Sequence, residues 1–174
     1  MHTPSARKGL TLVATIVGMV ALLTAWAFPL AAVSTAAPSQ VWVDDNYSPA
    51  TPGWGVTHFA TIPPALAAVA DGGEITVAPG RYAAPLTISK RVTLRGAGRD
   101  ATLLYAASGT ALTLAASGIT VDGIGIVNEG TATTGVRITG DQCTLQNSRI
   151  AGFLAEAVLG TASQQTVILA NDIA

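Results

Sequence analysis

Charged and aromatic side chains are scarce in this chain of 174 residues, with aromatics at only 5%. Charged residues make up 11% of it, against about 25% in an average soluble domain. The formal net charge is −1 and no basic patch is present, which excludes a nucleic-acid partner. The single cysteine, Cys143, cannot form an intrachain disulfide and has no metal-ligand partner at a recognisable spacing. The abundant residues, which are Val, Ile, Leu, Thr, Ala and Gly, suit stacked strands better than a helical bundle.

Residues 1–37 have the pattern of a leader. Arg7 and Lys8 precede an apolar run, Leu10–Leu23, and small residues follow at Ser34–Ala37. This pattern predicts a secretory signal peptide. An uncleaved membrane anchor is the alternative, because the apolar stretch reaches the roughly 20 residues that span a bilayer. In both cases the rest of the chain is expected to be secreted or at the cell surface, and any membrane contact is through this segment.

Residues 38–60 are predicted to form a linker and an N-terminal cap loop. Asp44 and Asp45 lie in this loop, and clustered carboxylates are ligands for calcium. A solvated turn is the alternative, because calcium needs six or more oxygen ligands and the loop shows no further acidic residue at regular spacing. No other cofactor is indicated. Trp42 and Trp54 flank the loop and could stack on sugar rings or cover the end of the core.

A short helix is predicted over Thr61–Ala70. Thr61 is a suitable N-cap, and prolines are tolerated in the first turn, where a missing N–H costs nothing. The glycines of Asp71–Gly73 end the helix, because glycine accepts a left-handed conformation. A solenoid needs a terminal cap over its first layer, and this helix is the candidate.

A repeat of 23 to 24 residues dominates the second half of the chain. Three lines match one another: Ile119–Ile126, Cys143–Ile150 and Thr166–Ile173. Their alternation of apolar and polar residues predicts strands with one buried face, and a repeat of this length indicates a solenoid. The segment Val92–Gly96 has the same pattern. The fifth position of each strand is Gly96, Gly123, Asn147 or Ala170. Glycine and asparagine at this position predict a sharp bend after the strand. Ala170 breaks the pattern, and there we expect Asn171 to take the bend instead.

Four segments carry a family resemblance: Val41–Asp45, Gly53–Ile62, Ala70–Tyr82 and Val92–Gly98. They resemble the opening of bacterial extracellular right-handed parallel β-helix proteins, which belong to the pectin-lyase-like superfamily. The resemblance implies an all-β fold, with a right-handed parallel β-helix of about four coils over residues 61–174 and a short N-terminal capping helix. The last line stops at Ala174 after an apolar strand, so we expect the β-helix to be incomplete there. The chain would then be truncated, or pair end-on with another chain.

In such a β-helix, matching positions form columns. Two inward columns are expected, one of Leu94, Val121, Leu145 and Ile168, the other of Ile126, Ile150 and Ile173. Cys143 falls in a third, with Val92, Ile119 and Thr166, and is expected to be a buried apolar side chain.

Two pairs of opposite charge share outward columns, Arg95 with Asp122 and Arg149 with Asp172. They are expected to form exposed ion pairs or, alternatively, to line a substrate groove. Arg137 could join that groove as a clamp for a uronate carboxylate.

The resemblance does not decide the activity, because the superfamily contains lyases, hydrolases, esterases, epimerases and proteins of no known activity. The calcium ligands of the lyases, the aspartate cluster of the hydrolases and the paired aspartates with arginine of the esterases are not evident here. We therefore expect a glycan-contacting or structural β-helix module without a complete catalytic site. The alternative is a truncated enzyme of the pectate or pectin lyase, hydrolase or esterase kind, acting on uronate-containing polysaccharides. An accessory protein with carbohydrate-binding-like repeats is a third interpretation.

Overall fold

The computed structural model describes residues 36–161 and 164–174. The predicted leader therefore lies, apart from Ala36 and Ala37, outside the described residues. Among those described, no helix is long and apolar enough to cross a membrane. They form one short helix and fourteen strands, and every named strand pair is parallel. The predicted all-β solenoid of about four coils with one short helix is confirmed.

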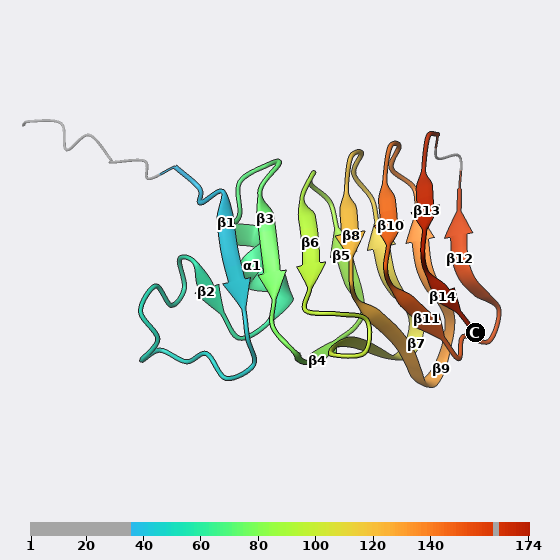
Figure 1. The fold of residues 1–174 in the computed structure, drawn as a ribbon, viewed down its shortest axis with the longest axis horizontal. Coiled ribbons are helices and arrows are strands. Elements are labelled where there is room, and N and C mark those ends of the chain that lie inside the picture. The colour runs from blue at the N-terminus through green and yellow to red at the C-terminus, as the bar shows by residue number, and fades with distance from the viewer. Residues whose placement is uncertain (1–35, 162–163) are drawn as a thin grey trace, which may run out of the picture. The chain divides into compact units, whose positions relative to one another are not determined.

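The first sheet takes one short strand from each coil. Figure 1 shows its strands side by side along the solenoid in nearly the order of the sequence. In spatial order they are β13 (Val167–Leu169), β10 (Thr144–Gln146), β8 (Thr120–Asp122), β6 (Thr93–Gly96), β3 (Glu74–Val77), β1 (Gln40–Val43) and β2 (His58–Phe59). Because side chains alternate along a strand, each column of this sheet faces either the core or solvent.

The second sheet contains two long strands that the repeat pattern did not predict. Its order is β14 (Asp172–Ile173), β11 (Arg149–Ala151), β9 (Gly125–Ile138), β7 (Thr102–Leu114) and β4 (Gly80–Ala83). Two more strands pair with the long strands outside this order: β5 (Leu86–Ile88) pairs with β7, and β12 (Glu156–Gly160) pairs with β9. Both β7 and β9 continue through a corner of the coil without a break. Register shifts between Ala106 and Thr110 let the ladder bend without ending.

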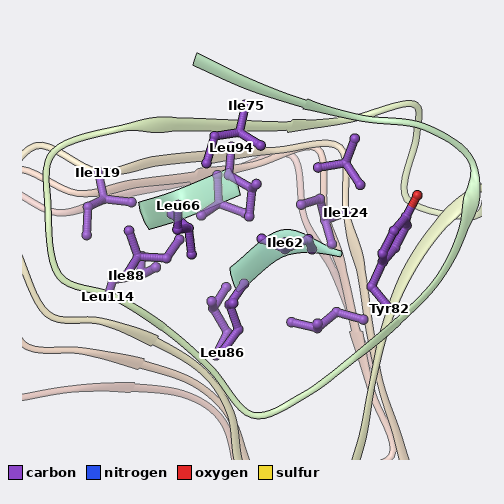
Figure 2. Packing of buried hydrophobic residues seen from close by; sticks show 14 of the residues in the cluster. Ile62, Leu66, Ile75, Tyr82, Leu86, Ile88, Leu94, Leu114, Ile119 and Ile124 are labelled. Carbon is purple, nitrogen blue, oxygen red and sulfur yellow. The ribbon is translucent and has the colours of Figure 1, made fainter. Parts of the chain in front are cut away.

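The inward columns are those predicted. Leu94, Val121 and Leu145 pair in register and are fully buried, and Ile126 and Ile150 are buried beside them. Figure 2 shows labelled core side chains, including Ile75 and Leu94, gathered within the turn of the chain. Cys143 is buried, as expected.

The last coil continues both columns but leaves their final members partly in solvent. Ile168 pairs with Leu145, and Ile173 pairs with Ile150. Their exposed fractions are 46% and 51%. The register therefore holds to the end of the described chain, while burial does not.

The capping helix is shorter than predicted. α1 spans Ile62–Ala68 and packs against β1, β2 and β3. Thr61 precedes it in an extended conformation, but its side chain makes no capping hydrogen bond, so that part of the prediction was wrong. The helix ends two residues early because Val69 is extended. Lys90 Nζ then donates hydrogen bonds to the carbonyl oxygens of Ala67 (3.3 Å) and Val69 (2.8 Å), which satisfies groups at the helix C-terminus.

The bends after the first-sheet strands follow the predicted positions with two differences. Gly123, Asn147 and Ala170 have φ angles of 68°, 51° and 50°. Ala170 thus takes the left-handed conformation itself, and the expected shift of the bend to Asn171 was wrong. Asn171 instead ties the last two coils together, because its side chain accepts from Ser148 N (2.9 Å) and donates to Leu145 O (2.8 Å). Gly96 has no positive φ, but a Cβ there would collide with the carbonyl oxygen of the next coil.

Candidate functional site

One outward column runs the whole length of the first sheet. Register pairing joins one residue from each strand, and an isolated bridge adds a residue of the cap loop. We call this set the long column: Trp54, His58, Trp42, Thr76, Arg95, Asp122, Gln146 and Leu169. Four of the residues that the sequence singled out, Trp42, Trp54, Arg95 and Asp122, therefore lie on one face.

Aromatic rings occupy the first positions of the long column. Trp42 stacks on His58 with ring centroids 5.2 Å apart and an interplanar angle of 18°. Tyr47 meets the same imidazole edge-on at 4.9 Å, and Thr57 Oγ1 lies 2.9 Å from its Nδ1. Trp42 and Trp54 are 36% and 37% exposed. The two indoles thus lie on the outer surface, where a flat apolar ligand can reach them.

Charged side chains follow in the middle of the long column. Arg95 Nη1 lies 3.2 Å from Asp122 Oδ2, and Arg95 Nε lies 3.6 Å from Glu74 Oε1. Asp122 also accepts a hydrogen bond from Asn147 Nδ2 at 2.8 Å. The sequence predicted the pair of Arg95 with Asp122 but missed Glu74 and Asn147. Glu74 occupies the repeat position of Thr93 on the preceding coil, so it reaches Arg95 diagonally and not along its own column.

A column of hydroxyl groups lies beside the long column. Thr93, Thr120 and Thr144 pair in register on successive strands and are all partly exposed. At the end of this column Val167 replaces threonine. The face therefore offers aromatic rings at one end, and hydroxyl, amide and paired charged groups along its middle.

The second predicted charge pair lies on the second sheet. Arg149 Nε is 3.9 Å from Asp172 Oδ2, and its Nη1 is 3.3 Å from Asp100 Oδ1. All three side chains are well exposed. Asp100 was not predicted, because it lies in a turn outside the repeat pattern. The result is an arginine between two aspartates, on a different sheet from the long column.

Arg137 does not join either group of charges. It lies on the part of β9 that pairs with β7 and β12, where its register neighbours are Thr113 and Leu159. It has no ion pair with any residue of 36–161 or 164–174. The expected groove formed by Arg137 with the other charges is therefore not present on one face.

The cap loop holds its two carboxylates in a tight turn. Asp44 Oδ1 accepts from both the backbone N–H and the side-chain amide of Asn46, each at 2.9 Å, and Asn46 Nδ2 also donates to Asp45 Oδ1 at 3.0 Å. The backbone hydrogen bond from Asn46 is the main cause that lowers the pKa of Asp44. Within the described parts of the chain, no group of three or more His, Cys, Asp or Glu residues could hold a metal. An amide donor facing both carboxylates suits a turn better than a cation, and calcium binding there stays a prediction.

Comparison with known proteins identifies the fold. No family model and no curated protein sequence matches the chain. A solved pectin methylesterase in complex with a hexasaccharide matches with a TM-score of 0.59 at 18% identity, over 68% of this chain and 45% of that one. A mutant pectin methylesterase with a hexasaccharide matches with a TM-score of 0.60 at 17% identity, over 74% and 48%. Pectin methylesterase PemA from Erwinia chrysanthemi matches with a TM-score of 0.58 at 18% identity, over 68% and 45%.

These matches confirm the predicted fold, a right-handed parallel β-helix like that of the solved pectin methylesterases. The chain spans about half the length of the solved structures that it matches. At such low identity the likeness concerns the backbone, so it assigns no role to any side chain of this chain.

Proposed function

We propose that this chain is a secreted or cell-surface β-helix module that binds a polysaccharide along the long column. The observation that carries the proposal is the pair of exposed indoles, Trp54 and Trp42, on either side of the partly buried His58 ring and in register with polar groups on the following strands. A sugar ring has apolar faces that pack on indole and hydroxyl groups that hydrogen-bond to side chains such as those of Thr120 and Gln146. The face supplies both kinds of contact in one line.

The strand spacing favours a polymer that crosses the strands. Successive positions of the long column are about 4.8 Å apart, because neighbouring strands have that separation. An extended glycan lying along the solenoid would place successive sugars over successive coils. The structural neighbours support this choice of ligand, because two of the solved pectin methylesterases hold hexasaccharides.

Truncating the two exposed indoles tests the proposal. We expect Trp42→Ala and Trp54→Ala each to weaken binding to highly methyl-esterified pectin by about tenfold in affinity gel electrophoresis, which corresponds to about 1.4 kcal/mol. Leu154→Ala is the matched control, because Leu154 is an exposed apolar side chain in the loop after β11, away from the long column. The proposal is wrong if the unmodified chain does not bind, or if all three variants bind alike.

A second candidate, an ester-hydrolysing enzyme, rests on the cluster of Asp100, Arg149 and Asp172. An arginine between two aspartates can hold one carboxylate ionised and orient it towards an ester carbonyl. Its test is methanol release from methyl-esterified pectin. Turnover that is lost in Asp172→Asn but kept in Glu156→Gln would establish the enzyme. Unsaturated-uronate release, with and without calcium, tests the lyase alternative in the same samples.

A further inference from the structure

The charged groups on the first sheet bear on which polysaccharide the face accepts. Its described strands carry only three charged side chains: Glu74, Arg95 and Asp122. Two carboxylates against one guanidinium leave one negative charge on this sheet. Arg95 could attract an acidic glycan only if its guanidinium were free to bind the carboxylate of that glycan.

The guanidinium of Arg95 already has a carboxylate beside each of its binding edges. A guanidinium grips a carboxylate through two adjacent N–H groups, either on the Nε side or at the tip of the fork. Asp122 Oδ2 accepts a hydrogen bond from Nη1 (3.2 Å), and Glu74 Oε1 forms an ion pair with Nε at 3.6 Å, so a carboxylate already faces each edge. A uronate carboxylate would have to displace one of these partners, and the displaced carboxylate would remain beside it.

Asp122 also places a poorly screened negative charge on the face. Its side chain is only 14% exposed and is held by Asn147 as well as by Arg95. A polyuronate carries one carboxylate on each sugar, and with sugars over successive coils several of these fall within the roughly 8 Å over which physiological salt leaves charges unscreened. Uncharged sugars meet no such repulsion and still contact the indoles, hydroxyls and amide.

We propose that this face selects an uncharged polysaccharide chain over a polyanionic one, and that Glu74 and Asp122 determine this selectivity. The proposal rests on the polysaccharide binding proposed above and specifies the class of ligand.

The experiment compares two probes of equal length, the fully methyl-esterified and the unesterified hexamers of galacturonic acid, by isothermal titration calorimetry with the full chain. We expect the esterified hexamer to bind about tenfold more tightly at low salt. This preference should shrink as salt is added, because screening weakens the repulsion and leaves ring stacking unchanged.

Two variants and one control assign the effect to the carboxylates. Asp122→Asn and Glu74→Gln each remove one negative charge beside Arg95, so each should raise the affinity for the unesterified hexamer about tenfold relative to that for the esterified one. Glu156→Gln removes the same charge from exposed β12, on the second sheet, and should alter neither. If Asp122→Asn misfolds, Glu74→Gln still tests the proposal, because Glu74 is the more exposed of the two carboxylates.

The outcomes distinguish failure of the selectivity proposal from failure of the proposed polysaccharide binding. If neither hexamer binds, polysaccharide binding itself is wrong. If the unesterified hexamer binds more tightly, or if both variants leave the ratio of the two affinities unchanged, the selectivity proposal is overturned while polysaccharide binding stands.

Discussion

The cost of truncating a core side chain should fall along the solenoid, from a fully enclosed coil to the last one. Leu94, Leu145 and Ile168 occupy the same inward column on three coils. Leu94 lies between Ile75 and Val121, and all three are fully buried. Among the described residues, Ile168 has a column neighbour only in Leu145, and it is 46% exposed. The same chemical change therefore removes different amounts of buried surface.

The magnitudes follow from these environments. Leu94→Ala leaves a cavity between rigid neighbours and should lower the free energy of unfolding by about 3–5 kcal/mol. Leu145→Ala should cost about 2–3 kcal/mol, because the half-exposed rung beside it can relax into the space. For Ile168→Ala we expect about 1 kcal/mol, roughly half of the contribution of a fully buried side chain.

Urea unfolding followed by far-UV circular dichroism measures the series. With an m value of about 2 kcal/mol per molar, the midpoint should fall by about 2 M for Leu94→Ala and about 0.5 M for Ile168→Ala. If the Ile168 variant loses as much stability as the Leu94 variant, the reasoning from burial fails. The last coil would then be covered in solution, as end-on pairing with another chain would do. Repeating the measurement at several protein concentrations distinguishes such pairing from an error in the burial argument.

Three further predictions concern single contacts. Burial and nearby carboxylates raise the pKa of Tyr82 to about 12. The folded chain therefore keeps the phenol proton longer than the unfolded chain, stability falls as the pH rises from about 10 to 12, and Tyr82→Phe should abolish that fall in unfolding curves. Gly140→Ala should cost about 1–3 kcal/mol in thermal unfolding, because its Cβ would collide with the carbonyl oxygen of Ala116. Its control, Gly109→Asn, should cost little, since that site is open and asparagine tolerates its φ of 68°. Lys90→Met should lower the unfolding free energy by about 0.5–1 kcal/mol, by removing the donor to the C-terminal carbonyls of α1.

Much of the fold could be predicted because a solenoid repeats its own pattern. The alignment of Leu94, Val121 and Leu145 by spacing alone is the register that the structure shows. The corners could not be predicted in the same way. At the corner crossed by β7 and β9, bulges keep the ladder intact, and Ala170 accepts a conformation for which its residue type has no preference.

The candidate site was only partly visible in the sequence. The pair of Arg95 with Asp122 followed from the repeat, because both sit at the same position of adjacent coils. Asp100 and Glu74 were missed for different reasons. Asp100 belongs to a turn whose geometry no repeat constrains, whereas Glu74 sits two positions along its strand from the column of Arg95 and reaches across to it. The repeat spacing predicts which residues stack in one column, but it does not predict which neighbouring columns a long side chain can contact.

The coils of the solenoid differ in length, although the outward positions of the first sheet stay aligned. Successive register positions of the first sheet are separated by 19, 27, 24 and 23 residues, from Glu74 through Thr93, Thr120 and Thr144 to Val167. The corner turns absorb these differences, and the strands stay aligned. Residues can therefore be gained or lost at the corners without shifting any outward position, and a whole added coil would lengthen the long column by one position. The number of coils would then set how long a polymer the face can contact, independently of which residues recognise each sugar.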